Sequence, residues 1–308
     1  MRDAFVRRVT EIAVADPRLI VITADLGFKL FDDFQARCPG RFLNVGVAEA
    51  NMVSVAAGLA LAGKRPFTYS IAPFATARCL EQIRDDVCGM DLPVVVVGVG
   101  GGFSYGPNGS THHGVDDVAI MRSLPGMTVV VPCDPRETES ALQALVELGR
   151  PAYLRLGRSK EPLLPGTGDS FALGVPTPLR DGRDVALLAC GPIASEALQA
   201  ADQLSLRGVQ AAVLSAHTVK PLGSLLKCVS RFDHIFVIEE HGPCGGLYEA
   251  LSGEILESGT YRGSLVRMSA PDRFYRFVGS SGFLRHASGL DSEAIVSRVM
   301  TTLEQRHR

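Results

Sequence analysis

Short apolar runs alternate along this chain with longer segments that carry an apolar residue at every third or fourth position. This alternation predicts strands separated by amphipathic helices, which is typical of parallel βαβ units. Asp134 followed by Pro135 is typical of a helix N-cap with proline at the first helical position. In the first half, strands are predicted at 19–23, 42–45, 66–70, 93–99, 127–131 and 152–156, and helices at 3–15, 48–61, 75–88 and 135–148.

A segment rich in proline and glycine interrupts the alternation between residues 157 and 182, and its lack of periodicity predicts an interdomain connection. A second alternation then begins, with strands predicted at 184–189, 209–214, 234–239 and 264–268, and helices at 193–206, 245–257 and 292–303. We therefore predict an α/β fold with two doubly wound, mostly parallel-sheet domains in tandem. The predicted boundaries are 1–160 for the first domain, 161–182 for the connection and 183–308 for the second domain.

The composition excludes several classes of protein. The chain has 308 residues, of which 46% are hydrophobic and 21% charged, and such fractions are incompatible with a disordered chain. Its 31 Lys and Arg and 33 Asp and Glu give a net charge of −2, and no long block carries charges of one sign. The sequence therefore lacks the charge pattern that is typical of binding to nucleic acids or to membrane surfaces. The longest apolar runs, such as 94–99 and 185–190, are far shorter than the roughly 20 residues that span a bilayer.

The cysteines and the N-terminal segment indicate a reducing compartment. The 7 cysteines form no CxxC pair, and their odd number argues against a fully paired disulfide framework. Asp3 and Glu11 lie among apolar and basic residues near the N-terminus, so this segment lacks the uncharged core of a signal peptide. We expect a cytoplasmic protein with small-molecule or protein partners.

A carboxylate, Glu49, stands at the predicted junction of a strand and a helix rich in alanine and glycine. One interpretation is that Glu49 only complements the positive end of the helix dipole. Its neighbours, which are valines, alanines and Met52, allow another. A carboxyl group in a closed apolar site holds its proton more readily, and it then suits a hydrogen bond to a heterocyclic nitrogen. The residues alone leave both interpretations open.

Five motifs follow one another along the first half of the chain: ADLG at 24–27, NVGVAEANM at 44–52, FATAR at 74–78, NGSTHHG at 108–114 and SLPGMTVVVPCDP at 123–135. In these motifs and their order, the sequence resembles transketolases. The stretch IEEHGPCGGL at 238–247 resembles part of the family's C-terminal domain. The resemblance covers nearly the whole chain, but only the second half of a full-length transketolase: the pyrimidine-binding domain plus the C-terminal domain. It implies transfer of a two-carbon ketol unit between sugars or sugar phosphates, with thiamine diphosphate as cofactor.

One motif of the family is missing. Transketolases bind the cofactor's diphosphate through a magnesium ion on a domain that carries Gly-Asp-Gly and a downstream Asn, and this sequence contains no Gly-Asp-Gly run. The resemblance therefore implies the C-terminal subunit of a split transketolase, with no metal site of its own. A separate N-terminal subunit with the Gly-Asp-Gly motif would supply the magnesium ion, and we expect a heterotetramer of two copies of each chain that acts in carbohydrate metabolism.

The resemblance assigns the pyrimidine end of the cofactor to three residues. Glu49 matches the glutamate that hydrogen-bonds the aminopyrimidine ring and favours its imino tautomer. Asp25 matches the aspartate of the family's ADL motif, near the cofactor and the domain contact. Phe74 matches an aromatic residue that packs on the pyrimidine. The two outer aromatic positions of the family's pattern are occupied here by Ile71 and Ala77, which predicts a looser pocket.

The loop at 108–114 and two arginines are assigned to the substrate. His112 matches the catalytic histidine that bonds the substrate carbonyl or hydroxyl and shuttles a proton. Its neighbour His113 stands where the family more often has glutamine. Arg2 and Arg158 match arginines that bind the sugar phosphate, because a planar guanidinium holds two oxygens at once.

Two departures from the family concern the donor sugar. Asn108 stands where transketolases for ordinary sugar phosphates carry an aspartate that recognises a donor hydroxyl, and Gly100 stands where they carry a histidine. These substitutions predict a different substrate preference.

Two other motifs suggest functions that their surroundings do not support. The glycines at 98–102 lack the third glycine of a dinucleotide-binding fingerprint, and we expect them to shape a substrate loop instead. Cys244 lies between glycines, but no pattern pairs it with a base.

Alternative functions remain open on the sequence alone. They are a β subunit of a 2-oxoacid or acetoin dehydrogenase, a deoxyxylulose phosphate synthase-like enzyme, and a noncatalytic scaffold paralogue. The NGSTHH loop and Arg2 favour sugar phosphate substrates, and Glu49 argues against a scaffold.

Overall fold

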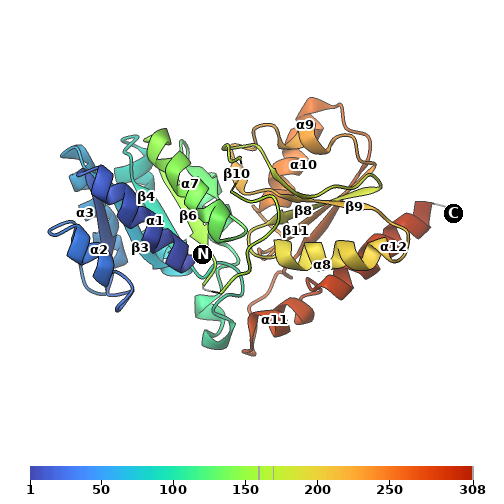
Figure 1. Ribbon diagram of the computed structural model, residues 1–308, viewed down its shortest axis with the longest axis horizontal. Coiled ribbons are helices and arrows are strands. Elements are labelled where there is room, and N and C mark those ends of the chain that lie inside the picture. The colour runs from blue at the N-terminus through green and yellow to red at the C-terminus, as the bar shows by residue number, and fades with distance from the viewer. Residues whose placement is uncertain (159, 169, 307–308) are drawn as a thin grey trace.

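The chain folds into two α/β halves, each built on one sheet with helices on both faces (Figure 1). The computed structural model describes residues 1–158, 160–168 and 170–306. Both sheets are mostly parallel, which confirms the predicted fold class.

The first sheet has the strand order β10-β5-β6-β4-β3-β1-β2, and its strands run parallel except for β10. Its central strands are fully buried because helices cover both faces, as is typical of parallel sheets. The strands are β1 (Leu19–Thr23), β2 (Phe42–Asn44), β3 (Arg65–Ile71), β4 (Val95–Val99), β5 (Thr128–Val130), β6 (Ala152–Leu156) and β10 (Thr218–Lys220).

Side chains of successive residues in a strand of the first sheet pack into two different cores, one on each face of the sheet. Val97 of β4 packs in the core that contains α1 (Arg2–Ala15), α2 (Asp32–Arg37) and α7 (Pro135–Leu148). Its neighbour Val96 packs in the core that contains α3 (Glu49–Leu61) and α6 (Asp117–Ser123). This two-residue period explains why the apolar runs of the sequence identify the strands.

The predicted N-cap of α7 is confirmed. One carboxylate oxygen of Asp134 accepts a hydrogen bond from the backbone N–H of Glu137 at 2.8 Å, which satisfies one of the free N–H groups of the first turn.

The helix predicted at 75–88 is instead a series of short helical segments of different hydrogen-bond periods. The hydroxyl of Thr76 bonds to the carbonyl of Ala72 at 2.7 Å, and such a bond competes with the backbone pattern of a regular helix. The segments are α4 (Ala72–Thr76), the 3₁₀ turn η1 (Ala77–Cys79), α5 (Leu80–Gln82) and the π-helical η2 (Ile83–Cys88).

The second sheet has the order β12-β11-β8-β9-β7, with β7 antiparallel to β9. α8 and α12 pack in the core on one face, and α9 and α10 pack in the core on the other. Its strands are β7 (Thr177–Arg180), β8 (Val185–Cys190), β9 (Ala211–Ser215), β11 (His234–Glu239) and β12 (Ser264–Ser269), and its helices are α8 (Ala194–Ser205), α9 (Leu225–Val229), α10 (Leu247–Ser258), α11 (Ser281–Ala287) and α12 (Ser292–Arg306).

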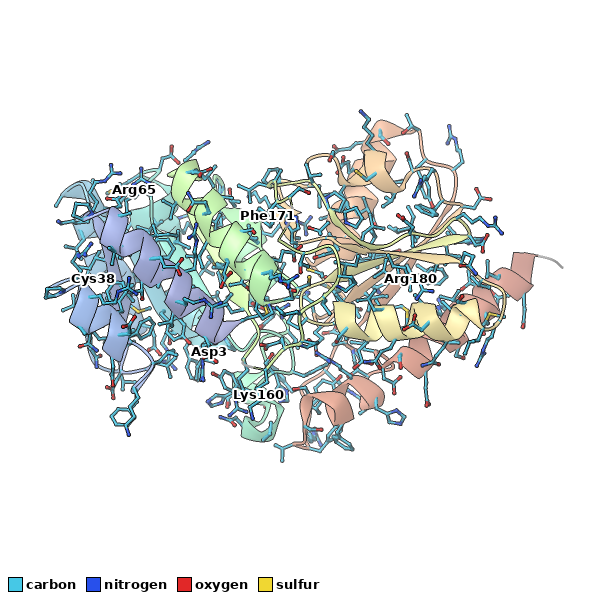
Figure 2. All side chains as sticks on the ribbon, in the orientation of Figure 1. Asp3, Cys38, Arg65, Lys160, Phe171 and Arg180 are labelled. Carbon is cyan, nitrogen blue, oxygen red and sulfur yellow. The ribbon has the colours of Figure 1, made fainter. Side chains whose placement is uncertain are left out.

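The two halves share secondary structure. β10 follows β9 in the sequence, yet it pairs antiparallel with β5 of the first sheet, with Thr218 opposite Val130. Phe171, from the predicted connection, stacks on His217 with ring centroids 4.2 Å apart, and Figure 2 shows it beside α7. The described residues of the predicted connection therefore pack against both halves, since Leu164 and Leu179 lie in the core that contains α8 and Phe171 packs against the core that contains α7. The predicted connection also contains β7.

A buried charge network also crosses the junction. Arg155 on β6 is 3% exposed, and its guanidinium lies 3.0 Å from the carboxylate of Asp117. The same guanidinium donates to the backbone carbonyls of Gly114 and of Glu240, the residue after β11. The carboxylate of Glu240 in turn accepts a hydrogen bond from Arg285 of α11 at 2.9 Å. Charged side chains thus tie the loop after β4 to the C-terminal half.

Within the described part of the chain, no helix has both the length and the apolar character that a bilayer span requires.

Candidate active site

The candidate site lies at the carboxyl edge of the first sheet, where the loops after several parallel strands meet. This edge is the usual place for ligand sites in open α/β sheets. The predicted residues follow different strands: Asp25 follows β1, Glu49 follows β2, Phe74 follows β3, Asn108, His112 and His113 follow β4, and Arg158 follows β6.

Glu49 is the first residue of α3, and its side chain is 3% exposed. The hydroxyl of Ser70, near the end of β3, donates to one carboxylate oxygen at 3.3 Å. The guanidinium of Arg78 donates to the other at 2.6 Å. Glu49 is therefore a buried carboxylate whose two oxygens are both engaged, rather than an exposed cap of a helix.

Phe74 and His112 are connected to this carboxylate through Arg78. The ring of Phe74, in α4, is half-buried, and the guanidinium carbon of Arg78 lies 4.5 Å from its centroid. The ring of His112, in the 3₁₀ turn η4 (Ser110–His112), lies 5.2 Å from the Phe74 ring at an interplanar angle of 69°. Arg78 thus links Glu49 to Phe74 and His112 in one cluster.

His113 lies in a different environment from its neighbour. It is 4% exposed, and its ring meets the rings of Phe103 and Tyr275 edge-on at 5.8 and 5.9 Å. Burial lowers the pKa of His113, so the ring is neutral at pH 7. Since Tyr275 belongs to the C-terminal half, this position favours packing between the halves over substrate contact.

The structure gives a steric reason for a glycine at position 100. Its φ is +82°, and a Cβ at this position would lie 2.0 Å from the ring of Tyr105. The ring of Tyr105 therefore occupies the space that a larger side chain needs. Asn108, in the 3₁₀ turn η3 (Gly106–Asn108), is exposed on the same loop, and its backbone N–H donates to the carbonyl of Tyr105 at 2.9 Å.

The two predicted phosphate-binding arginines lie together at the edge of this loop. The backbone N–H of Arg2 donates to the carbonyl of Arg158 at 3.3 Å, and the guanidinium carbon of Arg158 lies 5.4 Å from the centroid of Tyr105. Arg2 and Tyr105 line a cavity of about 360 Å³ together with Lys29. Lys29 and Tyr105 lie outside the motifs that predicted the site.

Asp25 lies just after β1, and Asn44 is the last residue of β2. Its backbone N–H donates to the side-chain oxygen of Asn44 at 2.9 Å, and the amide of Asn44 donates back to the carboxylate at 3.1 Å. Both residues line a cavity of about 600 Å³. The mutual hydrogen bonds link the loops after β1 and β2.

Arg78 makes the main contact of this cluster that the motifs did not predict. It lies in the FATAR motif at 74–78, which by itself indicates no role for this arginine. One signal was available, because Phe74 and Arg78 are four residues apart, the spacing at which side chains meet on a helical surface.

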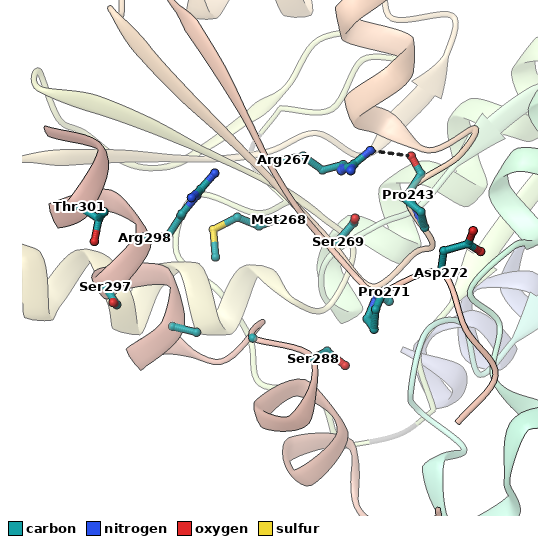
Figure 3. A pocket seen from close by; sticks show the side chains of 13 residues that line it. Pro243, Arg267, Met268, Ser269, Pro271, Asp272, Ser288, Ser297, Arg298 and Thr301 are labelled. Carbon is teal, nitrogen blue, oxygen red and sulfur yellow. Dashed lines mark hydrogen bonds between the residues drawn. The ribbon is translucent and has the colours of Figure 1, made fainter. Parts of the chain in front are cut away.

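A cavity of about 680 Å³ lies at the end of β12 and shares no lining residue with the candidate site (Figure 3). Arg267 and Arg298 line it, and Arg267 donates to the carbonyl of Pro243 at 3.4 Å. Size alone therefore does not identify the site. Among the residues that the structure describes, no group of His, Cys, Asp and Glu is arranged to hold a metal ion.

We expect Cys244 to be the fastest thiol to react with iodoacetamide at pH 7.5, because it is exposed. Burial raises the pKa of Cys79 to about 12 and that of Cys88 to about 11, so these thiols remain protonated and slow. Peptide mapping after a short exposure checks this order. Cys244→Ser should remove the fast label, and a fast label on Cys79 or Cys88 would contradict the expected order.

Comparison with known proteins identifies both halves. Residues 1–162 match the family model described as transketolase, pyrimidine binding domain, and residues 176–295 match that described as transketolase, C-terminal domain. The chain is 36% identical over 310 residues to the 6-deoxy-6-sulfo-D-fructose transketolase subunit SqwH of Clostridium sp. strain MSTE9, covering 100% of this chain and 95% of the relative. It is 36% identical over 250 residues to an apulose-4-phosphate transketolase subunit of Phocaeicola vulgatus, covering 80% of each.

A solved structure has the same fold over nearly the whole chain. It is described as a split gene transketolase, inactive beta4 tetramer, and it superposes with a TM-score of 0.89 at 33% identity, covering 98% of each chain. The chain therefore belongs to the transketolase family and comprises that family's pyrimidine-binding and C-terminal domains.

Proposed function

We propose that this transketolase subunit completes its active site with a separate N-terminal subunit and transfers a two-carbon ketol unit between sugars or sugar phosphates. The partner would carry the Gly-Asp-Gly motif and the magnesium ion, in a heterotetramer of two copies of each chain. The relatives named above are called subunits, and the split-gene relative is described as an inactive beta4 tetramer, which supports a requirement for a partner. A cytoplasmic location stays a prediction.

The observation that carries the proposal is the buried carboxylate of Glu49, which Arg78 joins to the half-buried ring of Phe74. A carboxyl group suits a ring nitrogen, and an aromatic face suits the plane of a pyrimidine, so these residues fit the pyrimidine end of thiamine diphosphate. The turn before Glu49 leaves space, because a Cβ on Gly46 would meet no atom within 4 Å. When bound, this cofactor supplies the carbanion chemistry of ketol transfer.

The residues of this chain then have separate tasks. Glu49 holds a proton at a ring nitrogen of the cofactor, from a position that excludes water because it is 3% exposed. His112 moves a proton at the substrate carbonyl or hydroxyl. Arg2 and Arg158, which lie together, hold the anionic end of the sugar. Asp25, tied to Asn44, holds the loop after β1 near the cofactor.

The other functions have less support. Relatives that match this chain over most of both lengths are named transketolase subunits, which favours ketol transfer over a deoxyxylulose phosphate synthase or a 2-oxoacid dehydrogenase β subunit. The buried cluster around Glu49 argues against a noncatalytic scaffold.

Reconstitution tests the proposal. The chain alone should show neither two-carbon transfer nor magnesium-dependent binding of thiamine diphosphate, whereas a mixture with the N-terminal subunit should show both. Calorimetry and a coupled assay of ketose consumption measure these properties. Micromolar, magnesium-dependent cofactor binding by the chain alone would contradict the split-subunit proposal.

We expect xylulose 5-phosphate to be a poor donor for the reconstituted enzyme, because Asn108 accepts a hydrogen bond without the charge that roughly doubles its strength. Asn108→Asp should raise kcat/KM for this donor by about 5-fold, the effect of about 1 kcal/mol. Wild-type turnover of xylulose 5-phosphate at about 10⁴ M⁻¹s⁻¹ or more would show that the substitutions at residues 100 and 108 do not redirect specificity.

A further inference from the structure

One guanidinium engages both parts of the proposed pyrimidine site, which we define as the carboxylate of Glu49 and the ring face of Phe74. Arg78 donates to Glu49 at 2.6 Å, and its guanidinium carbon lies 4.5 Å from the centroid of the Phe74 ring. The planar guanidinium thus combines a hydrogen bond to a carboxylate with contact to an aromatic face, which is also what an aminopyrimidine requires.

The burial of the two partners differs. Glu49 is 3% exposed, whereas Arg78 is 47% exposed. A buried carboxylate without a partner is costly, so the ion pair stabilises the free subunit. The longer and more exposed Arg78 is the partner that is free to turn towards solvent, while Glu49 is fixed at the start of α3 beside Ser70.

We infer that Arg78 masks the pyrimidine site in the free subunit and leaves Glu49 and Phe74 when the cofactor ring binds. The inference rests on the proposed function, because it takes the cofactor site to be the one proposed above. Apparent affinity falls by the fraction of molecules whose site is open, so the mask weakens cofactor binding until it is displaced. Arg78 then sets cofactor affinity without itself belonging to the loaded site.

The test replaces Arg78 by methionine, which keeps an apolar stem and removes the guanidinium. Equilibrium dialysis of thiamine diphosphate with magnesium against the reconstituted complex should give a Kd at least 5-fold lower for Arg78→Met than for the wild type. Arg84→Met is the matched control, because Arg84 forms an exposed pair with Asp85, and its Kd should stay within 2-fold of the wild type.

Introducing Arg78→Met into the Glu49→Gln variant tests whether Arg78 acts through its contact with Glu49. In Glu49→Gln the carboxylate that holds Arg78 is gone, so adding Arg78→Met should change the Kd by less than 2-fold. This non-additivity is a binding measurement and does not depend on turnover.

The binding measurements distinguish failure of this inference from failure of the proposed function. If the wild-type complex binds the cofactor and Arg78→Met binds it equally or more weakly, Arg78 is a permanent part of the site and the inference is overturned while the proposed function stands. If the wild-type complex binds no cofactor, the proposed function fails, and the Glu49–Arg78 pair is only a structural contact.

Discussion

Turnover of the reconstituted enzyme is expected to fall by about 10²- to 10⁴-fold when Glu49 is replaced by glutamine, the range that a positioned acid–base group contributes. Glutamine keeps the size of the side chain and its contact with Ser70, but an amide does not exchange a proton with a ring nitrogen. The expected loss is therefore in kcat, and the variant should remain folded. Steady-state kinetics and circular dichroism measure the two properties.

Glu81→Gln is the matched control, since it makes the same substitution at an exposed position of α5, and its rate should stay within about 2-fold of the wild type. If Glu49→Gln keeps more than about a third of the wild-type rate, the buried carboxylate acts on the helix dipole alone and the proposed role is wrong.

Stability should fall by about 3–5 kcal/mol when Arg155 is replaced by methionine, because Asp117 would remain as a buried charge without its partner. Asp117 is fully buried and accepts a hydrogen bond from the hydroxyl of Tyr153 at 2.5 Å, so it has little access to water after the substitution. Urea unfolding monitored by circular dichroism measures the change in the free energy of unfolding.

Two further variants separate a buried ion pair from a general effect of losing an arginine. Arg150→Met breaks a surface pair with Asp91 in which both side chains are 57% exposed, so it should cost less than about 1 kcal/mol. Adding Asp117→Asn to Arg155→Met should recover part of the lost stability, because both charges are then removed. A loss of less than about 1 kcal/mol for Arg155→Met alone would contradict the assignment.

The long elements were predictable because burial on two faces leaves a clear pattern. Strands such as β4 and β8 read as continuous apolar runs, and α7 carries its own N-cap signal in Asp134. Short elements left no such pattern. β10 has only 3 residues, and its pairing with β5 depends on a contact between segments almost 90 residues apart in the sequence.

The candidate site, too, was predictable only in part. The family resemblance pointed to Glu49, Phe74 and His112, and the structure brings them together. The resemblance did not distinguish the environment of His112 from that of His113, because the difference lies in the packing of Tyr275, from the other half, against His113. The contact of Arg78 with Glu49 was equally invisible, since the two side chains meet only after α3 and the segment after β3 pack side by side.

The pairing of β10 with β5 bears on how this protein is divided for expression or gene fusion. A fragment that ends near residue 160 lacks Thr218 and Lys220, so the edge of β5 at Val129 and Val130 loses its neighbour. Open strand edges recruit strands from other molecules, and this one would join fragments into aggregates. Any division of the chain into its halves therefore needs to keep residues 218–220 with the first sheet, by circular permutation or by adding the strand as a peptide.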